Sequence, residues 1–315
     1  MTLRSLPACS AAGLGLGYLL DSLLGDPRHG HPVAGFGRVA QSLETRSYAD
    51  SRPAGAAHVA VLVGATVAFG LGLDRVSRCR PLARTVLTAA GSWAVLGGRS
   101  LRREADTIAG QLADGDLEGA RVQVRNLVGR DTAELAEAEV ARATVESLAE
   151  NTSDAVVAPL FWAAVAGLPG LLGYRAVNTL DAMIGHPSPR YLRFGWAAAR
   201  LDDLANWAPA RIAGVLTAGC APLVGGSPST ALAVVRRDAG QHPSPNAGVV
   251  EAAFAGALGL QLGGQNVYQG RVENRGTLGD GRDPDPADVI RAGRLAAAVS
   301  GAALVVAVAL RWARR

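Results

Sequence analysis

Apolar positions along the chain gather in long uncharged runs, which is typical of buried or membrane helices. Runs without Asp, Glu, Arg or Lys cover residues 5–20, 54–73, 85–98, 155–174, 212–235, 252–270 and 295–310. A membrane span needs about 17–25 apolar residues, and four of these runs approach that length, namely 54–73, 155–174, much of 212–235, and 295–310 with its flanks. The pattern predicts a multi-span membrane protein, and a soluble helical protein with buried core helices is the alternative.

One stretch departs from this pattern, because residues 99–150 are polar with a helical period. Its periodicity breaks at Asp114–Asp116 and again at Gly129–Thr132. Asp116 and Thr132 are residue types that cap helix N-termini, so we expect about three amphipathic helices. Seven arginines between residues 99 and 154 favour the cytoplasmic side. The expected fold class is therefore all-α, a polytopic integral membrane protein with one domain over 1–315 that includes a cytoplasmic helical insert at 99–150.

The other elements follow from the same alternation of apolar and polar segments. We expect an apolar helix over 8–24, a polar loop to 53, helices over 55–73 and 82–98, a loop at 225–248, a weak apolar segment at 249–264, a polar loop to about 291, and a last span over 292–311. Pro159, Pro169 and Gly170 indicate that 155–174 is broken or re-entrant. Pro209 is expected to end or kink its helix. The number and orientation of the spans stay open at this point.

Composition narrows the class of protein. Hydrophobic residues make up 49% of the 315 positions and charged residues 18%, against about 25% charged in soluble domains. The net charge is +4, all basic side chains are Arg, and no basic run alternates with aromatics, which disfavours nucleic acid as a partner. The spacing of Cys9, Cys79 and Cys220 fits neither a disulfide framework nor a zinc site.

A stripe of carboxylates adjoins one of the apolar runs. Glu146, Glu150 and Asp154 recur every four residues, with Asn151 between them, and the uncharged run 155–174 follows directly. Like charges at this spacing repel each other, and their partly desolvated end calls for a cation. A solvated helix face and a contact with Mg²⁺ or substrate are the two interpretations.

Two further polar clusters follow the run. Arg175, Asn178 and Asp181 recur at i, i+3 and i+6, which places a cation, an amide and an anion along one helical stripe. A structural ion pair is the simpler interpretation, but Asn and Asp oxygens are also ligands that Mg²⁺ accepts.

The second of these clusters lies in the stretch GWAAARLDDLANWAPAR. Arg200, Asp202, Asp203, Asn206 and Arg211 have the residue types of a magnesium–phosphate site. Polar clusters at the ends of apolar helices indicate an intramembrane or interfacial site.

The stretch DSLLGDPRHGHP contains another possible site. It includes Asp21, Asp26, Arg28, His29 and His31. Because His-x-His lies here in a Gly/Pro-containing segment, a tight turn is the favoured interpretation over metal binding.

The motifs resemble the adenosylcobinamide-phosphate synthase family, the CobD/CbiB proteins. The matching stretches are DSLLGDPRHGHPV, VGRDT, ESLAENTSDAVVAPLFW, YRAVNTLDAMIGH, YLRFGWAAARLDDLANWAPARI and HPSPNAGVVEAAFAGALGLQLGG, in order from residue 21 to 264. The resemblance implies a multi-pass enzyme of the cell (inner, cytoplasmic) membrane. Such an enzyme uses ATP to join (R)-1-amino-2-propanol, or its O-phosphate, to the propionate carboxylate of adenosylcobyric acid in cobalamin biosynthesis.

This chemistry gives the candidate residues their expected roles. ATP-dependent ligation requires Mg²⁺ on the phosphates, cations for developing charge, and exclusion of water. We expect metal contacts from Asn151, Asp154, Asn178, Asp181 and Asn206. Catalytic roles are expected for Glu146, Glu150, Asp202 and Asp203: either glutamate takes the amine proton, and both aspartates help to organise Mg²⁺ and phosphate. Substrate or phosphate contacts are expected from Arg130, Arg175, Arg200, Arg211 and Asn246, and Asn246 and Glu251 are expected to close the site. Because the chain has no Lys, a Walker-type phosphate loop is excluded and ATP requires another kind of site.

Two rival functions fit part of the pattern. An AmpE-like membrane sensor without catalytic activity is disfavoured because it need not keep the Asp, Asn and Arg clusters together. A small-molecule transporter is disfavoured because no paired inverted halves are visible. The sequence does not determine whether the amine donor is free or phosphorylated. The expected protein partners of such an enzyme are a second copy of the chain or other enzymes of the cobalamin pathway.

Overall fold

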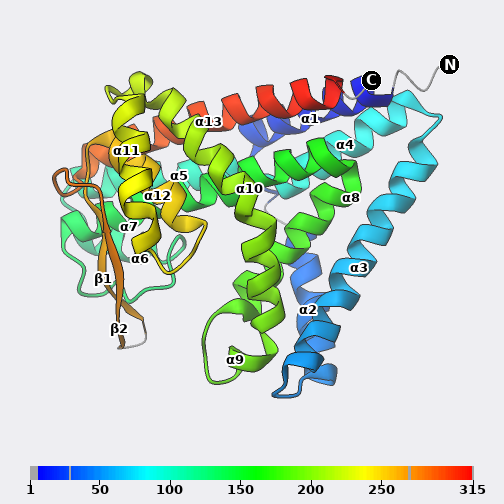
Figure 1. The fold of residues 1–315 in the computed structure, drawn as a ribbon, viewed down its shortest axis with the longest axis horizontal. Coiled ribbons are helices and arrows are strands. Elements are labelled where there is room, and N and C mark those ends of the chain that lie inside the picture. Colours follow the sequence, from blue (N-terminus) through cyan, green and yellow to red (C-terminus); the bar gives the residue numbers. More distant parts are fainter. Residues whose placement is uncertain (1–5, 28–29, 269–270, 314–315) are drawn as a thin grey trace. The chain divides into compact units, whose positions relative to one another are not determined.

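The computed structural model describes residues 6–27, 30–268 and 271–313 as helices with one small β-hairpin (Figure 1). The elements are α1 (Leu6–Leu24), α2 (Pro32–Ser47), α3 (Arg52–Ser77), α4 (Pro81–Val95), α5 (Gly98–Ala113), α6 (Leu117–Val124), α7 (Glu137–Thr152), α8 (Ala158–Leu180), α9 (Tyr191–Phe194), α10 (Trp196–Cys220), α11 (Pro228–Asp238), α12 (Ala247–Leu258), β1 (Leu262–Tyr268), β2 (Arg271–Leu278) and α13 (Pro286–Ala313). Two π-helical turns, Ser153–Val157 and Asp181–Gly185, follow α7 and α8. The all-α class is confirmed, and the two-stranded sheet is an addition to it.

The chain divides into two compact units. Unit 1 comprises residues 1–97, 158–206 and 304–315, and unit 2 comprises 98–157 and 207–303. The carboxylate stripe therefore lies in unit 2, whereas most of the apolar run that follows it lies in unit 1.

Four helices among the described residues are long and apolar enough to cross a membrane. They are the helical segments Arg52–Ser77, Glu137–Gly185, Trp196–Val224 and Pro286–Ala313. Each contains or overlaps one of the four long apolar runs of the sequence. The structure thus supports a membrane protein, as the sequence predicts.

The expected break in the run 155–174 is present. Inside α8, Gly167 has φ +69° and ψ −149°, which is not a helical conformation, and Pro169 follows two residues later. Proline cannot donate the helical hydrogen bond, and glycine tolerates positive φ. The helix is therefore interrupted at Gly167. Pro209, in contrast, lies inside helix α10, so the helix does not end there, and the alternative of a kink at Pro209 stays a prediction.

Glycines allow α1 and α4 to pack closely within unit 1. A Cβ on Gly13 would lie 2.6 Å from the Thr88 Cβ, and one on Gly17 would lie 2.4 Å from the Ser92 Cβ. This Gly-x-x-x-Gly spacing places both glycines on one helix face, the small-residue pattern that lets membrane helices approach each other.

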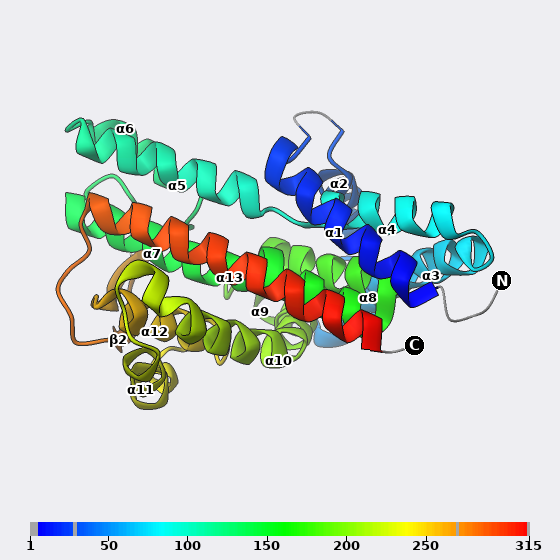
Figure 2. The same cartoon turned by 90° about the horizontal axis from the view of Figure 1, so that it is seen from above.

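Unit 2 contains the three helices expected between residues 99 and 150, and Figure 2 shows α5 and α6 beside each other. Asp116 caps α6 as predicted, since its Oδ1 accepts a hydrogen bond from the Gly119 N–H at 2.9 Å. The predicted cap at Thr132 is wrong, because α7 begins at Glu137 after Ala136. The Thr132 hydroxyl instead donates to the Arg121 carbonyl at 2.9 Å.

Three segments expected to be loops contain regular structure. Residues 32–47 and 228–238 form α2 and α11, each with proline in its first turn. Residues 262–268 and 271–278 form the antiparallel strands β1 and β2, with a bulge between Gly263 and Gln265. Figure 1 shows these strands as a narrow ribbon in unit 2, and both strands contact α12.

Candidate functional site

A buried ionic network in unit 2 has Glu146 at its centre. One of its carboxylate oxygens, Oε2, accepts a hydrogen bond from Arg130, and the side chains of both residues are about 95% buried. The other oxygen, Oε1, accepts the Gly263 backbone N–H at 2.8 Å. Arg130 also donates to the Asn266 Oδ1 at 2.7 Å. The cation that the carboxylate stripe calls for is thus supplied, at Glu146, by the chain itself.

The hairpin bulge brings the Gly263 backbone to this carboxylate. Gly263 has φ +80°, and a Cβ there would lie 2.2 Å from the Gly276 carbonyl oxygen. Only glycine fits such a position without displacing the opposite strand. Loss of the hairpin register would therefore remove a hydrogen bond from Glu146.

Glu251, on the fully buried helix α12, lies in the same electrostatic environment. Burial raises the pKa of Glu251 well above its ordinary value of 4.5, and the negative charges of Glu146 and Glu150 raise it further. The positive charges of Arg275 and Arg130 oppose this shift. Two carboxylates and two guanidinium groups balance each other when Glu251 is protonated. The neutral acid is therefore the form that this environment favours.

His242 is the neighbour of Glu251. Its Nε2 lies 3.7 Å from the Glu251 Oε1, and its Nδ1 accepts the Ser244 backbone N–H at 3.0 Å. Burial lowers the pKa of His242, as does the positive charge of Arg275. A neutral ring that accepts at Nδ1 carries its proton on Nε2, and that proton faces Glu251.

The rest of the carboxylate stripe is less buried than Glu146. Glu150 and Asp154 are half-buried, and Asp154 lies in the π-helical turn after α7, where the helical phase changes. Asn151 donates to the Ser147 carbonyl and hydroxyl oxygens, both at 3.0 Å. Of the predicted catalytic glutamates, Glu150 is therefore the more accessible.

A second polar cluster lies in unit 1, between α8 and α10. The Asp202 carboxylate accepts hydrogen bonds from the amide of Asn206 at 2.9 Å and from that of Asn178 at 3.4 Å. Arg175 donates to the Asn178 Oδ1 at 3.4 Å, and the Tyr174 hydroxyl donates to the Asn206 Oδ1 at 2.9 Å. Two stretches that the sequence treats as separate clusters thus join around Asp202.

The other predicted residues pair locally. In unit 1 the Arg200 guanidinium lies 3.5 Å from the Asp203 carboxylate, and Asp181 is half-buried in the π-helical turn after α8. In unit 2 the Arg211 guanidinium donates to the Asn246 Oδ1 at 2.9 Å. The predicted site residues are therefore divided between the units: Arg130, Glu146, Glu150, Asn151, Asp154, Arg211 and Asn246 in unit 2, and Arg175, Asn178, Asp181, Arg200, Asp202, Asp203 and Asn206 in unit 1.

The His-x-His motif is partly accounted for. His31 precedes α2, and its Nδ1 accepts the Val33 N–H at 3.2 Å as a helix cap. Its Nε2 lies 3.7 Å from Asp26. Arg28 and His29 lie outside the described residues. The interpretation of His31 as part of a turn agrees with these contacts.

Four residues of the two networks were not among the predicted site residues. They are Tyr174, His242, Asn266 and Arg275. His242 opens the motif HPSPNAG, which the sequence does show, but Asn266 and Arg275 lie in the hairpin that was expected to be a loop.

The oxygen donors of unit 1 suit magnesium that is already bound to phosphate. In the part of the chain that the structure describes, no three His, Cys, Asp or Glu side chains converge to hold a metal ion. Mg²⁺ on a nucleotide requires only one or two protein carboxylates, because phosphates and water complete its shell. Asp202, with the Asn178 amide beside it, supplies such a partial set.

Comparison with known proteins places the chain in a family. The family model described as CobD/Cbib protein matches residues 14–296. A Mycobacterium tuberculosis protein named "Cobalamin biosynthesis protein CobD" is 55% identical over 306 residues, covering 97% of each chain. Proteins of the same name from Geobacter metallireducens (47% identical, 84% of this chain and 85% of the relative) and Rhodobacter capsulatus (44% identical, 93% and 95%) also match. No solved structure shows a significant match. The chain belongs to the CobD/CbiB protein family.

Proposed function

We propose that this protein acts in cobalamin biosynthesis at the cytoplasmic membrane, as an ATP-dependent amide ligase. Its substrates would be adenosylcobyric acid and (R)-1-amino-2-propanol or its O-phosphate. The observation that carries the proposal is the family match over nearly the whole chain, together with relatives named for cobalamin biosynthesis. The four membrane-length helices support a location in a membrane.

The reaction sets clear demands on the protein. A carboxylate is a poor acylating agent, so its oxygen first attacks the γ-phosphorus of ATP, which gives an acyl phosphate and ADP. The amine then attacks the acyl carbon, expels inorganic phosphate and loses a proton. The protein must hold the phosphates, exclude water from the acyl phosphate, and accept the amine proton.

The Asp202 cluster suits the phosphate part of this chemistry. Magnesium would neutralise phosphate charge there. Asn178 and Asn206 fix the Asp202 carboxylate by donating to its two oxygens, which leaves each oxygen a further lone-pair direction. Half-buried Arg175, at the edge of the cluster, would add a cationic donor for phosphate oxygens. Asp181, Asp203 and Arg200 would extend this phosphate site.

The network in unit 2 suits the amine part. Arg130 and the Gly263 N–H stabilise Glu146 as a charged carboxylate, so Glu146 serves to position its surroundings. Glu150, one helical turn later and half-buried, would accept the amine proton. Arg211 and Asn246, joined by a hydrogen bond, would contact the substrate carboxylate or phosphate. Asn151 and Asp154 would contribute oxygen ligands at the end of the stripe.

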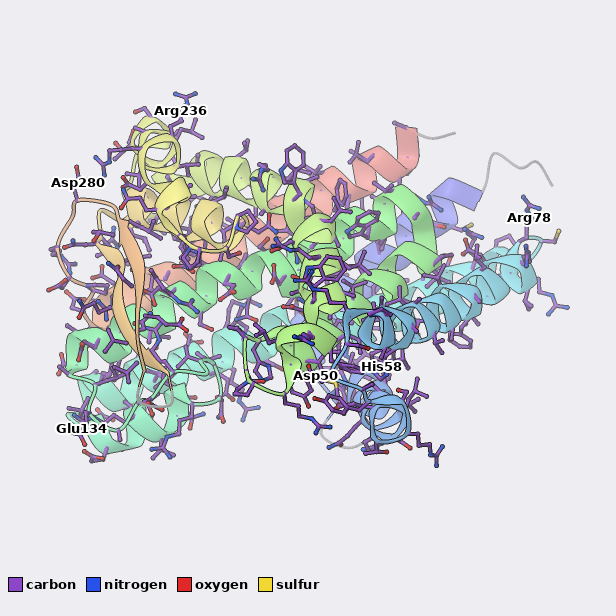
Figure 3. All side chains as sticks on the ribbon, turned by 60° about the horizontal axis from the view of Figure 1, so that its bottom comes forward. Asp50, His58, Arg78, Glu134, Arg236 and Asp280 are labelled. Atoms are coloured by element: carbon purple, nitrogen blue, oxygen red, sulfur yellow. The ribbon has the colours of Figure 1, made fainter. Side chains whose placement is uncertain are left out.

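A substitution at Asp202 tests the proposal. Purified protein in nanodiscs is supplied with adenosylcobyric acid, each amine and Mg-ATP, and the corrinoid product and ADP are measured together. Asp202→Asn should lower kcat by about 100-fold or more, the loss typical of a removed electrostatic contact, while insertion and elution behaviour stay unchanged. Asp50→Asn, at an exposed position labelled in Figure 3, is the matched control and should keep full activity. Unchanged product formation by Asp202→Asn would remove Asp202 from the mechanism, and no product from the wild type would overturn the proposed reaction.

A further inference from the structure

A basic cavity lies within unit 2, away from the residues assigned above. It has a volume of about 510 Å³ and is lined by residues of α5 and α13. Its charged lining consists of Arg99, Arg102, Arg103, Asp106 and Arg294. Four arginines against one aspartate give the cavity an excess of three positive charges.

The two helices that form this cavity approach each other at Asp106 and Gly293. A Cβ built on Gly293 of α13 would lie 3.9 Å from the Asp106 Oδ1 of α5. The exposed Asp106 carboxylate therefore lies within van der Waals distance of α13. The arginines come from the first two turns of α5 and from the N-terminal third of α13.

Among the described residues of unit 2, six arginines lie within ion-pair distance of an Asp or Glu, and none of them lines this cavity. They are Arg121, Arg130, Arg142, Arg237, Arg282 and Arg291. Among the residues that the structure describes, the exposed side chains of Arg99, Arg103 and Arg294 form no ion pair and no hydrogen bond. Arg102 is half-buried, and its Nε donates to the Gly98 carbonyl at 3.2 Å.

Four positive charges with a single negative charge beside them repel each other and favour an anion between them. Guanidinium groups donate in pairs to the oxygens of a phosphate, so arginine clusters are typical of phosphate recognition. The volume falls in the range of about 300–1,000 Å³ of small-molecule sites, which exceeds the needs of a simple ion. The first turn of α5 contains no acidic residue, so the positive end of the helix dipole adds to the positive potential.

We propose that the cavity formed by Arg99, Arg102, Arg103 and Arg294 is a binding site for a phosphate-bearing ligand, distinct from the Asp202 cluster and the Glu146 network. Two sources can supply this chemistry. A soluble polyphosphate is one. An anionic lipid headgroup is the other, because Arg294 is the last charged residue before the uncharged run 295–310 of a membrane-length helix.

Binding by the full chain in nanodiscs tests the proposal. The first arm uses phosphatidylcholine nanodiscs and measures inorganic tripolyphosphate binding by calorimetry. The second uses nanodiscs with phosphatidylglycerol and counts the lipids retained after detergent extraction by native mass spectrometry. The Arg99→Gln/Arg103→Gln/Arg294→Gln variant should bind tripolyphosphate about 10-fold or more weakly, or retain less phosphatidylglycerol, than the wild type. Weaker tripolyphosphate binding by the triple variant identifies a soluble phosphate as the ligand. Lower phosphatidylglycerol retention alone identifies a lipid.

Two further variants keep this test decisive. Among the described residues, the Asp106 carboxylate forms no hydrogen bond or ion pair, so Asp106→Asn removes the single negative charge of the cavity without breaking such a contact. The substitution should tighten binding several-fold. Arg236→Gln, at an exposed position on α11 that points outward in Figure 3, is the matched control and should bind as the wild type does. Equal binding by the wild type and the triple variant in both arms would overturn the proposal, as would weaker binding by Asp106→Asn.

Discussion

The ion pair between Glu146 and Arg130 gives a sharp prediction about stability. Glu146→Gln keeps the shape of the side chain and removes its charge. One oxygen of Glu146 faces Arg130 and the other accepts the Gly263 N–H at 2.8 Å. The new amide nitrogen must replace one of these oxygens, so it places a donor against a donor, and Arg130 is left charged in a buried site.

The expected cost follows from this burial. Removing one partner of a buried ion pair destabilises a protein by about 3–5 kcal/mol, because the remaining charge is uncompensated. Arg130→Gln should cost a similar amount for the same reason. The double variant leaves neither buried charge without its partner, so its loss should be smaller than the sum of the single losses by about 1–3 kcal/mol.

Equilibrium unfolding in detergent micelles, followed by circular dichroism, measures these quantities. Glu134→Gln is the matched control, because Glu134 is exposed in the same unit (Figure 3) and should change stability by less than about 0.5 kcal/mol. Additive losses in the two single variants and the double variant would refute the reasoning, as would a Glu146→Gln variant as stable as the control.

Three other variants test separate parts of the structure. Because burial raises the pKa of Glu251, the folded protein keeps the carboxyl proton of Glu251 at pH values where the unfolded chain has lost it, so wild-type stability should fall as pH rises from 4.5 towards the raised pKa. Glu251→Gln should remove that decline, and an unchanged pH profile of unfolding would contradict the raised pKa. Gly17→Val places a Cβ 2.4 Å from a side-chain carbon of α4 and should destabilise unit 1 by about 1–3 kcal/mol, whereas Gly15→Ala, with open space around Gly15, should not. Equal melting temperatures of these two variants would contradict the close packing of α1 on α4. Tyr174→Phe leaves the buried Asn206 Oδ1 without its 2.9 Å donor and should cost about 1–3 kcal/mol in thermal unfolding, and a neutral result would exclude that hydrogen bond.

Sequence alone was sufficient for features that depend on local pattern. The uncharged runs predicted the four membrane-length helices, since such a helix must be apolar along its whole length. Gly and Pro within 155–174 indicated the break that the structure places at Gly167. The cap at Asp116 also followed from residue type.

Features that depend on distant contacts could not be read in this way. The strands of the hairpin, LGGQNVY and RVENRGTL, lack the hydrophobic alternation by which a strand is recognised, and their Val267 and Val272 are exposed. Gly263 of this hairpin contacts Glu146, which is 117 residues away in the sequence. The helix α2 begins at Pro32 within a segment whose Gly and Pro content suggests a loop.

The candidate site likewise has local features that the sequence predicts and long-range contacts that it does not. Helical spacing placed Arg175 and Asn178 one turn apart, and the structure joins them by a hydrogen bond. Spacing could not show that Asn178 meets Asp202, or that the cation facing Glu146 is Arg130, since these contacts arise between helices and loops.

The central claim is that ATP activates the carboxylate of adenosylcobyric acid as an acyl phosphate. The most direct test uses adenosylcobyric acid labelled with ¹⁸O in that carboxylate, with purified protein, amine and Mg-ATP. Because the acyl phosphate keeps one carboxylate oxygen bonded to phosphorus, amide formation should release inorganic phosphate that carries one ¹⁸O per product. Amide product formed with unlabelled inorganic phosphate, or without consumption of ATP, would contradict the account.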